Sequence, residues 1–195
     1  MHINKGPGAN LILKFTKRVA TAALLVFSAM LPSFAQTRAV APALGYEVQK
    51  WPAGKAAPTL QATDMNGKVW LLKDLRGKAV MLNFWASWCE PCRAEMPSLQ
   101  TFAQTHADQL VVLTINVKEQ HSRVSQFVQR TALELPVVLD PNGTSARAWG
   151  ITIYPSTVLI DSRGNVRSVV RGEVDWSAQV ALKLLQPLLK QPLAK

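Results

Sequence analysis

The chain has 195 residues and a formal net charge of +10, with 22 basic and 12 acidic side chains. The basic residues are scattered singly and do not interleave with aromatic residues, which argues against a nucleic-acid-binding protein. Hydrophobic residues make up 48% of the chain, as is ordinary for a globular protein, and the length favours a single folded core.

Residues 1–35 have the layout of a secretory signal peptide. A basic segment without acidic residues is followed by an uncharged apolar run over 19–31 and by small residues at Ser33 and Ala35. We predict cleavage after Ala35. An uncleaved N-terminal membrane anchor is the alternative, because the uncharged run extends to Thr37 and approaches the roughly 20 residues that span a bilayer. Either way, the positive flank stays inside and the rest of the chain lies outside the cytoplasm.

Residues 36–57 are rich in alanine and proline and have no clear period, so we predict a spacer or an N-terminal arm. Residues 58–190 are predicted to form the folded domain. Its first element is an expected β-hairpin, in which two apolar segments flank Asn66 and Gly67. This dipeptide favours a type I′ turn.

The rest of the domain alternates between strand and helix patterns. Apolar runs of strand length predict strands over 79–86, 110–117, 135–140, 156–161 and 165–170. Apolar residues at helical spacing predict helices over 90–106, around 122–132, and at the C-terminal end over 177–190. The strands over 79–86 and 110–117 are nearly continuous in apolar residues, as in strands buried on both faces. This order predicts an α/β fold with a mixed central sheet flanked by helices.

The two cysteines of the chain, Cys89 and Cys92, lie three positions apart, between a predicted buried strand and the start of a helix. A structural disulfide is one interpretation, but so short a loop removes little entropy from the unfolded chain. A metal site is a second, but zinc needs four ligands, and the histidines after the signal, His106 and His121, have no zinc-finger spacing. A redox dithiol is favoured over both, so no metal is expected.

The position of the pair suits thiol–disulfide exchange. The N-terminus of a helix stabilises a thiolate, which assigns the attacking role to Cys89. Cys92, one turn further along, can then attack the mixed disulfide and release the partner. Pro91 suits the first helical turn. Glu90 acts against the thiolate, because it is a like charge beside Cys89.

The stretch FWASWCEPCRAEMP, residues 84–97, resembles the thioredoxin superfamily, and within it the TlpA/ResA-like group of extracytoplasmic thiol–disulfide oxidoreductases. Glu95 and Pro97 occupy positions of the group's pattern. The resemblance covers about residues 57–189 and implies a thioredoxin-like fold with an N-terminal β-hairpin and a central insertion over about 119–140. It also implies that the segment YPSTVLID places Pro155, as a cis-proline, opposite the cysteines.

One position departs from thioredoxin. Asn83 stands where the resemblance places a buried aspartate, and an asparagine cannot accept the proton of the buried cysteine. We expect Glu95 to take that role, because it lies one turn beyond Cys92 on the same helix. The alternative is that Glu95 is only an acid favoured by the helix dipole.

The resemblance implies an enzyme that reduces disulfides of periplasmic client proteins, for example in cytochrome c biogenesis or copper-site assembly. Its electrons would come from a membrane donor of the DsbD/CcdA kind, and no cofactor of its own is expected. The implied location is the periplasm, either free or anchored to the inner membrane. Two alternatives stay open: an oxidant that donates disulfides, and a client- or metal-binding module that uses the cysteines as ligands.

Overall fold

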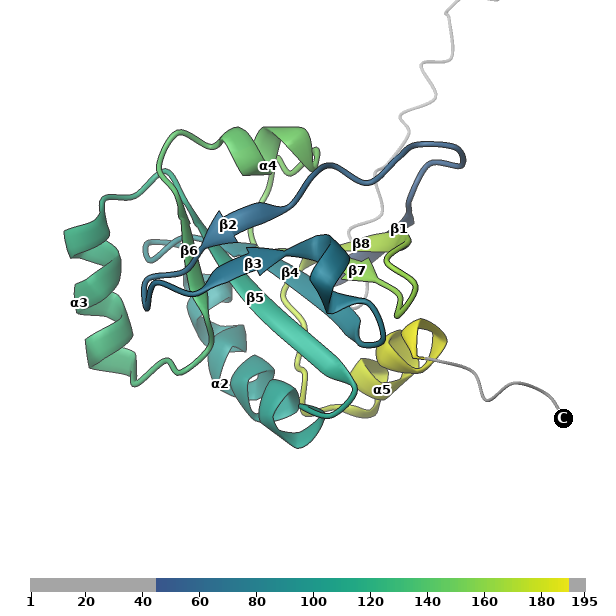
Figure 1. Ribbon diagram of the computed structural model, residues 1–195. Coiled ribbons are helices and arrows are strands. Elements are labelled where there is room, and N and C mark those ends of the chain that lie inside the picture. Colours follow the sequence, from purple (N-terminus) through teal and green to yellow (C-terminus); the bar gives the residue numbers. More distant parts are fainter. Residues whose placement is uncertain (1–44, 190–195) are drawn as a thin grey trace, which may run out of the picture. The chain divides into compact units, whose positions relative to one another are not determined.

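The computed structural model describes residues 45–189 of the chain (Figure 1). The predicted signal peptide or anchor and the first part of the predicted spacer lie outside the described residues. Within residues 45–189, no helix has the length and apolar character needed to cross a membrane.

A six-stranded mixed sheet forms the centre of the domain, in the order β1-β8-β7-β4-β5-β6. Its strands are β1 (Tyr46–Lys50), β4 (Ala79–Trp85), β5 (Leu110–Val117), β6 (Val137–Asp140), β7 (Ser156–Ile160) and β8 (Val166–Gly172). Strands β4, β5 and β6 are parallel, whereas β7 is antiparallel to β4 and to β8. The predicted α/β fold with a mixed sheet is confirmed.

The position of β4 in the middle of the sheet explains why its sequence is an almost unbroken apolar run. All seven of its residues are buried. Because side chains alternate across a strand, Met81 and Trp85 enter the core on one face of the sheet, whereas Leu82 and Phe84 enter the core on the other. A strand covered on both faces needs apolar residues at nearly every position.

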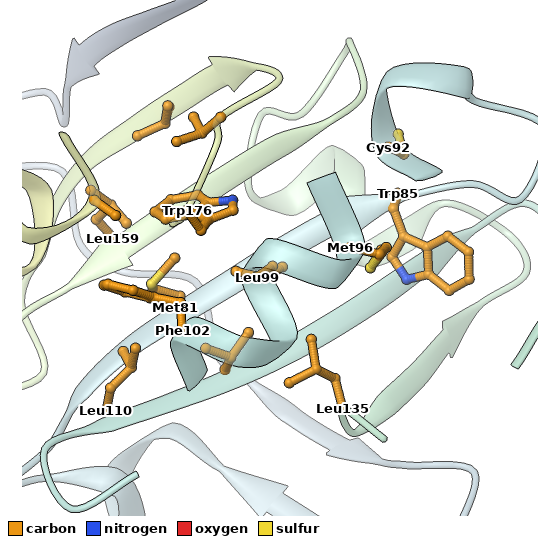
Figure 2. Packing of buried hydrophobic residues seen from close by; sticks show 14 of the residues in the cluster. Met81, Trp85, Cys92, Met96, Leu99, Phe102, Leu110, Leu135, Leu159 and Trp176 are labelled. Carbon is orange, nitrogen blue, oxygen red and sulfur yellow. The ribbon is translucent and has the colours of Figure 1, made fainter. Parts of the chain in front are cut away.

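Helices cover one face of the sheet. These are α2 (Glu90–Thr105), α3 (His121–Thr131) and α5 (Gln179–Leu185), the last followed by the short helix η2 (Gln186–Leu188). Figure 2 shows Met96 and Leu99 of α2 in this core, with Trp85 of β4 beside Met96. The first turn of α2, which contains Cys92, is thereby held against the sheet.

The opposite face is covered by a β-hairpin and a short helix. The hairpin consists of β2 (Gln61–Thr63) and β3 (Val69–Leu71), continues into η1 (Leu72–Leu75), and lies in front of the sheet in Figure 1. Helix α4 (Thr144–Ala148) covers the same face, and Trp149 after it is buried in this second core. The N-terminal hairpin expected from the sequence is present.

The turn of this hairpin differs from the expected type I′ turn. That turn requires positive φ at both central residues, but only Gly67 has it, at +85°, and Asn66 does not. The carboxylate of Asp64 organises the turn instead. It accepts hydrogen bonds from the backbone N–H of Asn66 at 2.9 Å, from that of Lys68 at 3.0 Å, and from Trp70 Nε1 at 2.8 Å.

Part of the segment predicted as a spacer or an N-terminal arm belongs to the sheet. Residues 46–50 form the edge strand β1, paired antiparallel with β8 from Tyr46 opposite Gly172 to Lys50 opposite Ser168. Four of the five residues of β1 are exposed, so the strand has no buried face to leave a period in the sequence. Backbone pairing with β8 holds it in the sheet, together with Tyr46, which packs against the core, and Gln49, which accepts a hydrogen bond from Arg171 Nε at 3.1 Å.

The central insertion implied by the resemblance is formed by α3 and β6. It follows β5 and adds β6 in parallel at the edge of the sheet, with Thr114 opposite Val137. Val124 of α3 is fully buried in the helical-side core. The insertion reaches the end of β4, the strand that precedes the cysteines, through Phe127 of α3, whose ring centroid lies 4.8 Å from that of Trp85.

Candidate active site

The two cysteines form a disulfide at the start of α2. Cys89 is the N-cap residue of the helix, and its Sγ accepts a hydrogen bond from the backbone N–H of Cys92 at 3.3 Å. Cys89 is 6% exposed and Cys92 is not exposed at all. Of the two sulfurs, only that of Cys89 is therefore open to a partner, and it lies where the helix end favours a negative charge.

Glu95 is buried one helical turn beyond Cys92. Its side chain is 2% exposed and accepts hydrogen bonds from Asn83 Nδ2 at 2.7 Å, from Val174 N at 3.2 Å and from Trp176 Nε1 at 3.4 Å. Burial raises the pKa of Glu95 to about 7, although these hydrogen bonds act in the opposite direction. The carboxyl group can therefore gain or lose a proton near neutral pH.

Asn83 lies on β4, and its side chain contacts both α2 and the neighbouring strand β7. Its Nδ2 donates to Glu95 and, at 3.0 Å, to Thr157 Oγ1 on β7. Its Oδ1 is buried and has no hydrogen-bond partner among the described residues. If the amide reorients, this oxygen can accept a hydrogen bond from a protonated Glu95, so Asn83 can bind either form of the carboxyl group.

Pro155 is a buried residue that lies beside the cysteine motif. The Tyr154–Pro155 peptide bond is cis, as the resemblance implied. Pro155 and Tyr154 line a shallow depression of about 500 Å³ together with Pro91, which stands between the two cysteines. Trp88 is 62% exposed, and its ring lies edge-on to that of Tyr154 at 6.2 Å. The structure thus brings the proline and the motif together, and the catalytic roles of Cys89, Cys92, Glu95 and Pro155 stay predictions.

Sequence reasoning missed Glu119, which holds the loop before Cys89. The carboxylate of Glu119 is buried and accepts hydrogen bonds from Ser87 N and Ser87 Oγ, both at 2.6 Å, and from Asn116 Nδ2 at 2.7 Å. Arg123 forms an ion pair with it at 3.1 Å. Burial opposes the charge, but the hydrogen bonds and the guanidinium outweigh burial and lower the pKa of Glu119.

A signal for Glu119 existed in the sequence. Glu119 comes two residues after β5 ends, and Ser87 comes two residues after β4 ends. Because β4 and β5 are parallel neighbours, their carboxyl ends meet at one edge of the sheet. A polar residue after each strand is therefore expected to lie close to the other.

Replacing Glu119 by alanine is expected to lower the free energy of unfolding by about 2–4 kcal/mol, because it leaves the part-buried donors of Ser87 and the buried amide of Asn116 unpaired. Glu119→Gln keeps some acceptors and is expected to cost less. Urea unfolding measures both, with Gln120→Ala, an exposed neighbour, as the control. Equal stability of the Glu119→Ala variant and the wild type would contradict the role of this contact.

The same contact has a defined pH dependence. Since the pKa of Glu119 is lowered in the folded state, its contribution is complete above the ordinary glutamate pKa and is lost as pH falls through the lowered value. The stability difference between wild type and Glu119→Ala should therefore shrink in acid.

No group of three or more histidine, cysteine, aspartate or glutamate side chains that could hold a metal ion occurs within residues 45–189. The cysteine pair is joined by its disulfide. The arrangement at the start of α2 thus has the parts needed for thiol–disulfide exchange: an accessible sulfur, a buried second sulfur and a buried carboxyl group with a raised pKa.

Comparison with known proteins agrees with this geometry. Residues 53–169 match the AhpC/TSA family. The chain is 38% identical over 120 residues to the thiol-disulfide oxidoreductase ResA of Geobacillus thermodenitrificans, across 61% of this chain and 69% of the relative. It is 33% identical over 119 residues to the thioredoxin-like protein YneN of Bacillus subtilis, across 60% of this chain and 69% of the relative.

Solved structures are similar over nearly their whole length. StoA from Bacillus subtilis superposes with a TM-score of 0.58 and 26% identity, across 67% of this chain and 98% of that structure. The exposed lipoprotein thioredoxin of Streptococcus pneumoniae superposes with a TM-score of 0.61 and 29% identity, across 67% and 100%. The chain therefore belongs to the AhpC/TSA family of thioredoxin-like proteins, in its group of ResA-like thiol–disulfide oxidoreductases.

Proposed function

We propose that this protein reduces disulfides of client proteins outside the cytoplasm, with Cys89 as the attacking and Cys92 as the resolving cysteine. The observation that carries the proposal is the unequal environment of the two sulfurs. Cys89 is 6% exposed and its Sγ accepts the Cys92 N–H, whereas Cys92 is fully buried. A thiolate is therefore favoured at the sulfur that a client can reach.

The reaction begins with the reduced protein. The Cys89 thiolate attacks one sulfur of the client disulfide, the bond between the two client sulfurs breaks, and the other client sulfur leaves as a thiolate. Cys92 then transfers its proton to Glu95 and attacks Cys89 Sγ, which releases the second client sulfur as a thiolate. Two electrons pass from the protein to the client, and the protein is left with the Cys89–Cys92 disulfide.

Glu95 suits the proton transfer in the second step. Its pKa of about 7 is close to that of a thiol in an exchange site, so the proton can move without a large free-energy difference. Asn83 supports both protonation states, because its amide can present either a donor or an acceptor.

The proposed partners follow from the electron balance. Each cycle leaves the protein oxidised, so a second dithiol must return two electrons, and a membrane donor of the DsbD/CcdA kind would supply them. The proposed clients are periplasmic proteins with disulfides to be reduced, as in cytochrome c maturation or copper-site assembly. The predicted signal peptide or inner-membrane anchor supports this location, and the ResA relatives support the exchange chemistry.

The reduction potential of the Cys89–Cys92 pair tests the direction. We expect a value below about −200 mV, closer to thioredoxin at about −270 mV than to DsbA at about −120 mV. Equilibration with glutathione mixtures of known ratio, read by thiol alkylation and mass, measures it. A value near that of DsbA would assign the protein as a disulfide-donating oxidant instead.

A further inference from the structure

A groove next to the cysteine motif is lined by basic side chains. It lies between α2 and α3, has a volume of about 350 Å³, and is lined by Arg93, Arg123, Arg130, Ser87, Phe127 and Gln126, among others. None of its lining residues is acidic. Phe127 packs against buried Trp85, with ring centroids 4.8 Å apart, which gives the groove a firm apolar wall. We call it the arginine groove.

The charge of the arginine groove is only partly compensated. Arg93 pairs with Glu90 on the exposed helix surface, where such a pair contributes little. Arg123 uses only its Nε, for Ser87 and Glu119, which leaves its two terminal nitrogens without a partner in the described part of the chain. Arg130 forms neither an ion pair nor a side-chain hydrogen bond within residues 45–189.

These free guanidinium donors favour one kind of ligand. A guanidinium group presents its N–H donors in a planar fork that matches a carboxylate, and it has no acceptor for another donor. An occupant with carboxylates would therefore be bound, whereas one with ammonium or guanidinium groups would be repelled. The apolar wall at Phe127 suits the side-chain stems of a polypeptide.

The opposite side of the motif has the opposite charge. The depression beside Pro155 is lined by Glu173 and Asp175 and by no basic side chain. Ser87 and Arg93, which flank the cysteines in the sequence, belong to the arginine groove, whereas Pro91 belongs to the acidic depression. A polypeptide whose disulfide lies over Cys89 thus meets positive charge on one side and negative charge on the other.

We propose that the arginine groove binds aspartate and glutamate side chains of the client, next to the cysteine that undergoes exchange. The inference rests on the proposed function and extends it to client choice. It follows that clients with an acidic segment beside the reacting cysteine are reduced faster than clients with a basic one. Charges at the rim of such a contact act mainly on the association rate.

Three matched peptides test the proposal. Each contains the same intramolecular disulfide, flanked by aspartates, by serines or by lysines, and each is mixed with pre-reduced full-length protein in low salt. We expect the aspartate peptide to react about three- to tenfold faster than the lysine peptide, and this preference to shrink in high salt. The readout is the second-order rate constant of disulfide reduction.

Arg130→Glu is the informative variant, because Arg130 is exposed and contacts neither the cysteines nor Glu119. It is expected to slow reduction of the aspartate peptide by about three- to tenfold and to accelerate reduction of the lysine peptide. Arg163→Glu, which reverses an exposed arginine in the turn between β7 and β8, is the control for net charge and should leave the preference intact.

The outcomes separate the inference from the function. Equal rates for the aspartate and lysine peptides, or a preference that survives Arg130→Glu, would overturn the arginine groove while the serine peptide still reported a working reductase. Failure of the wild type to reduce even the serine peptide would overturn the proposed function, and the inference with it.

Discussion

Replacing Cys92 by serine is expected to stop the reaction at the mixed disulfide. Cys89 keeps its place at the helix N-terminus and can still attack, but no second thiolate remains to release the client. Multiple-turnover reduction of a protein disulfide should fall by about a thousandfold or more. Covalent complexes of the variant with extracytoplasmic proteins should accumulate, as measured on non-reducing gels and by mass spectrometry.

The matched variants assign the two roles. Cys89→Ser should be equally inactive but should form no complexes, because the remaining Cys92 sulfur is fully buried. The double variant should also trap nothing. Complexes with Cys89→Ser and none with Cys92→Ser would reverse the assignment of attacking and resolving cysteines.

The wild-type protein is expected to lose stability as pH rises, and replacing Glu95 by glutamine should abolish this loss. The pKa of Glu95 is about 7 in the folded protein against an ordinary value of 4.5, so between these values the folded state binds more protons than the unfolded state. Stability therefore falls as pH rises from about 4.5 through about 7, by roughly 3 kcal/mol in all. Urea unfolding of the oxidised protein across this range measures it.

Glutamine fits the site without a new unpaired group at the carboxyl position. Its oxygen can accept from Val174 and Trp176, and its amide nitrogen can donate to Asn83 Oδ1 once that side chain reorients. The variant should thus resemble the wild type near pH 4.5 and be more stable at pH 8. Parallel curves for the two proteins would contradict the raised pKa.

The same variant should slow resolution of the mixed disulfide by about a hundredfold near neutral pH, because glutamine cannot accept the Cys92 proton. Glu90→Gln is the matched control, since Glu90 lies in the same helix but its side chain is 78% exposed. Stopped-flow measurement of client release across pH distinguishes the two. Unchanged release in Glu95→Gln would make Glu95 an acid that only supports the helix.

The sequence by itself determined the features that depend on neighbouring residues. The cysteine spacing, the helix that begins at Glu90 and the continuous apolar strands β4 and β5 were all predictable, because helix starts and buried strands leave a local pattern. The proximity of Glu95 to Cys92 followed from helical spacing alone. The resemblance of residues 84–97 to the thioredoxin superfamily added the family and the place of Pro155, and the family is confirmed.

Other features were decided only by the tertiary structure, because they join segments far apart in the chain. Glu95 has a raised pKa because the folded domain buries it, and this outweighs the hydrogen bonds from Val174 and Trp176, which lower the pKa. Strand β1 is held by backbone pairing with β8, which leaves no side-chain pattern to read. The arginine groove exists because the inserted helix α3 packs beside α2, which brings Arg130 to the same surface as Arg93. In each case the deciding contact joins residues far apart in the sequence, so no local period in the sequence indicates it.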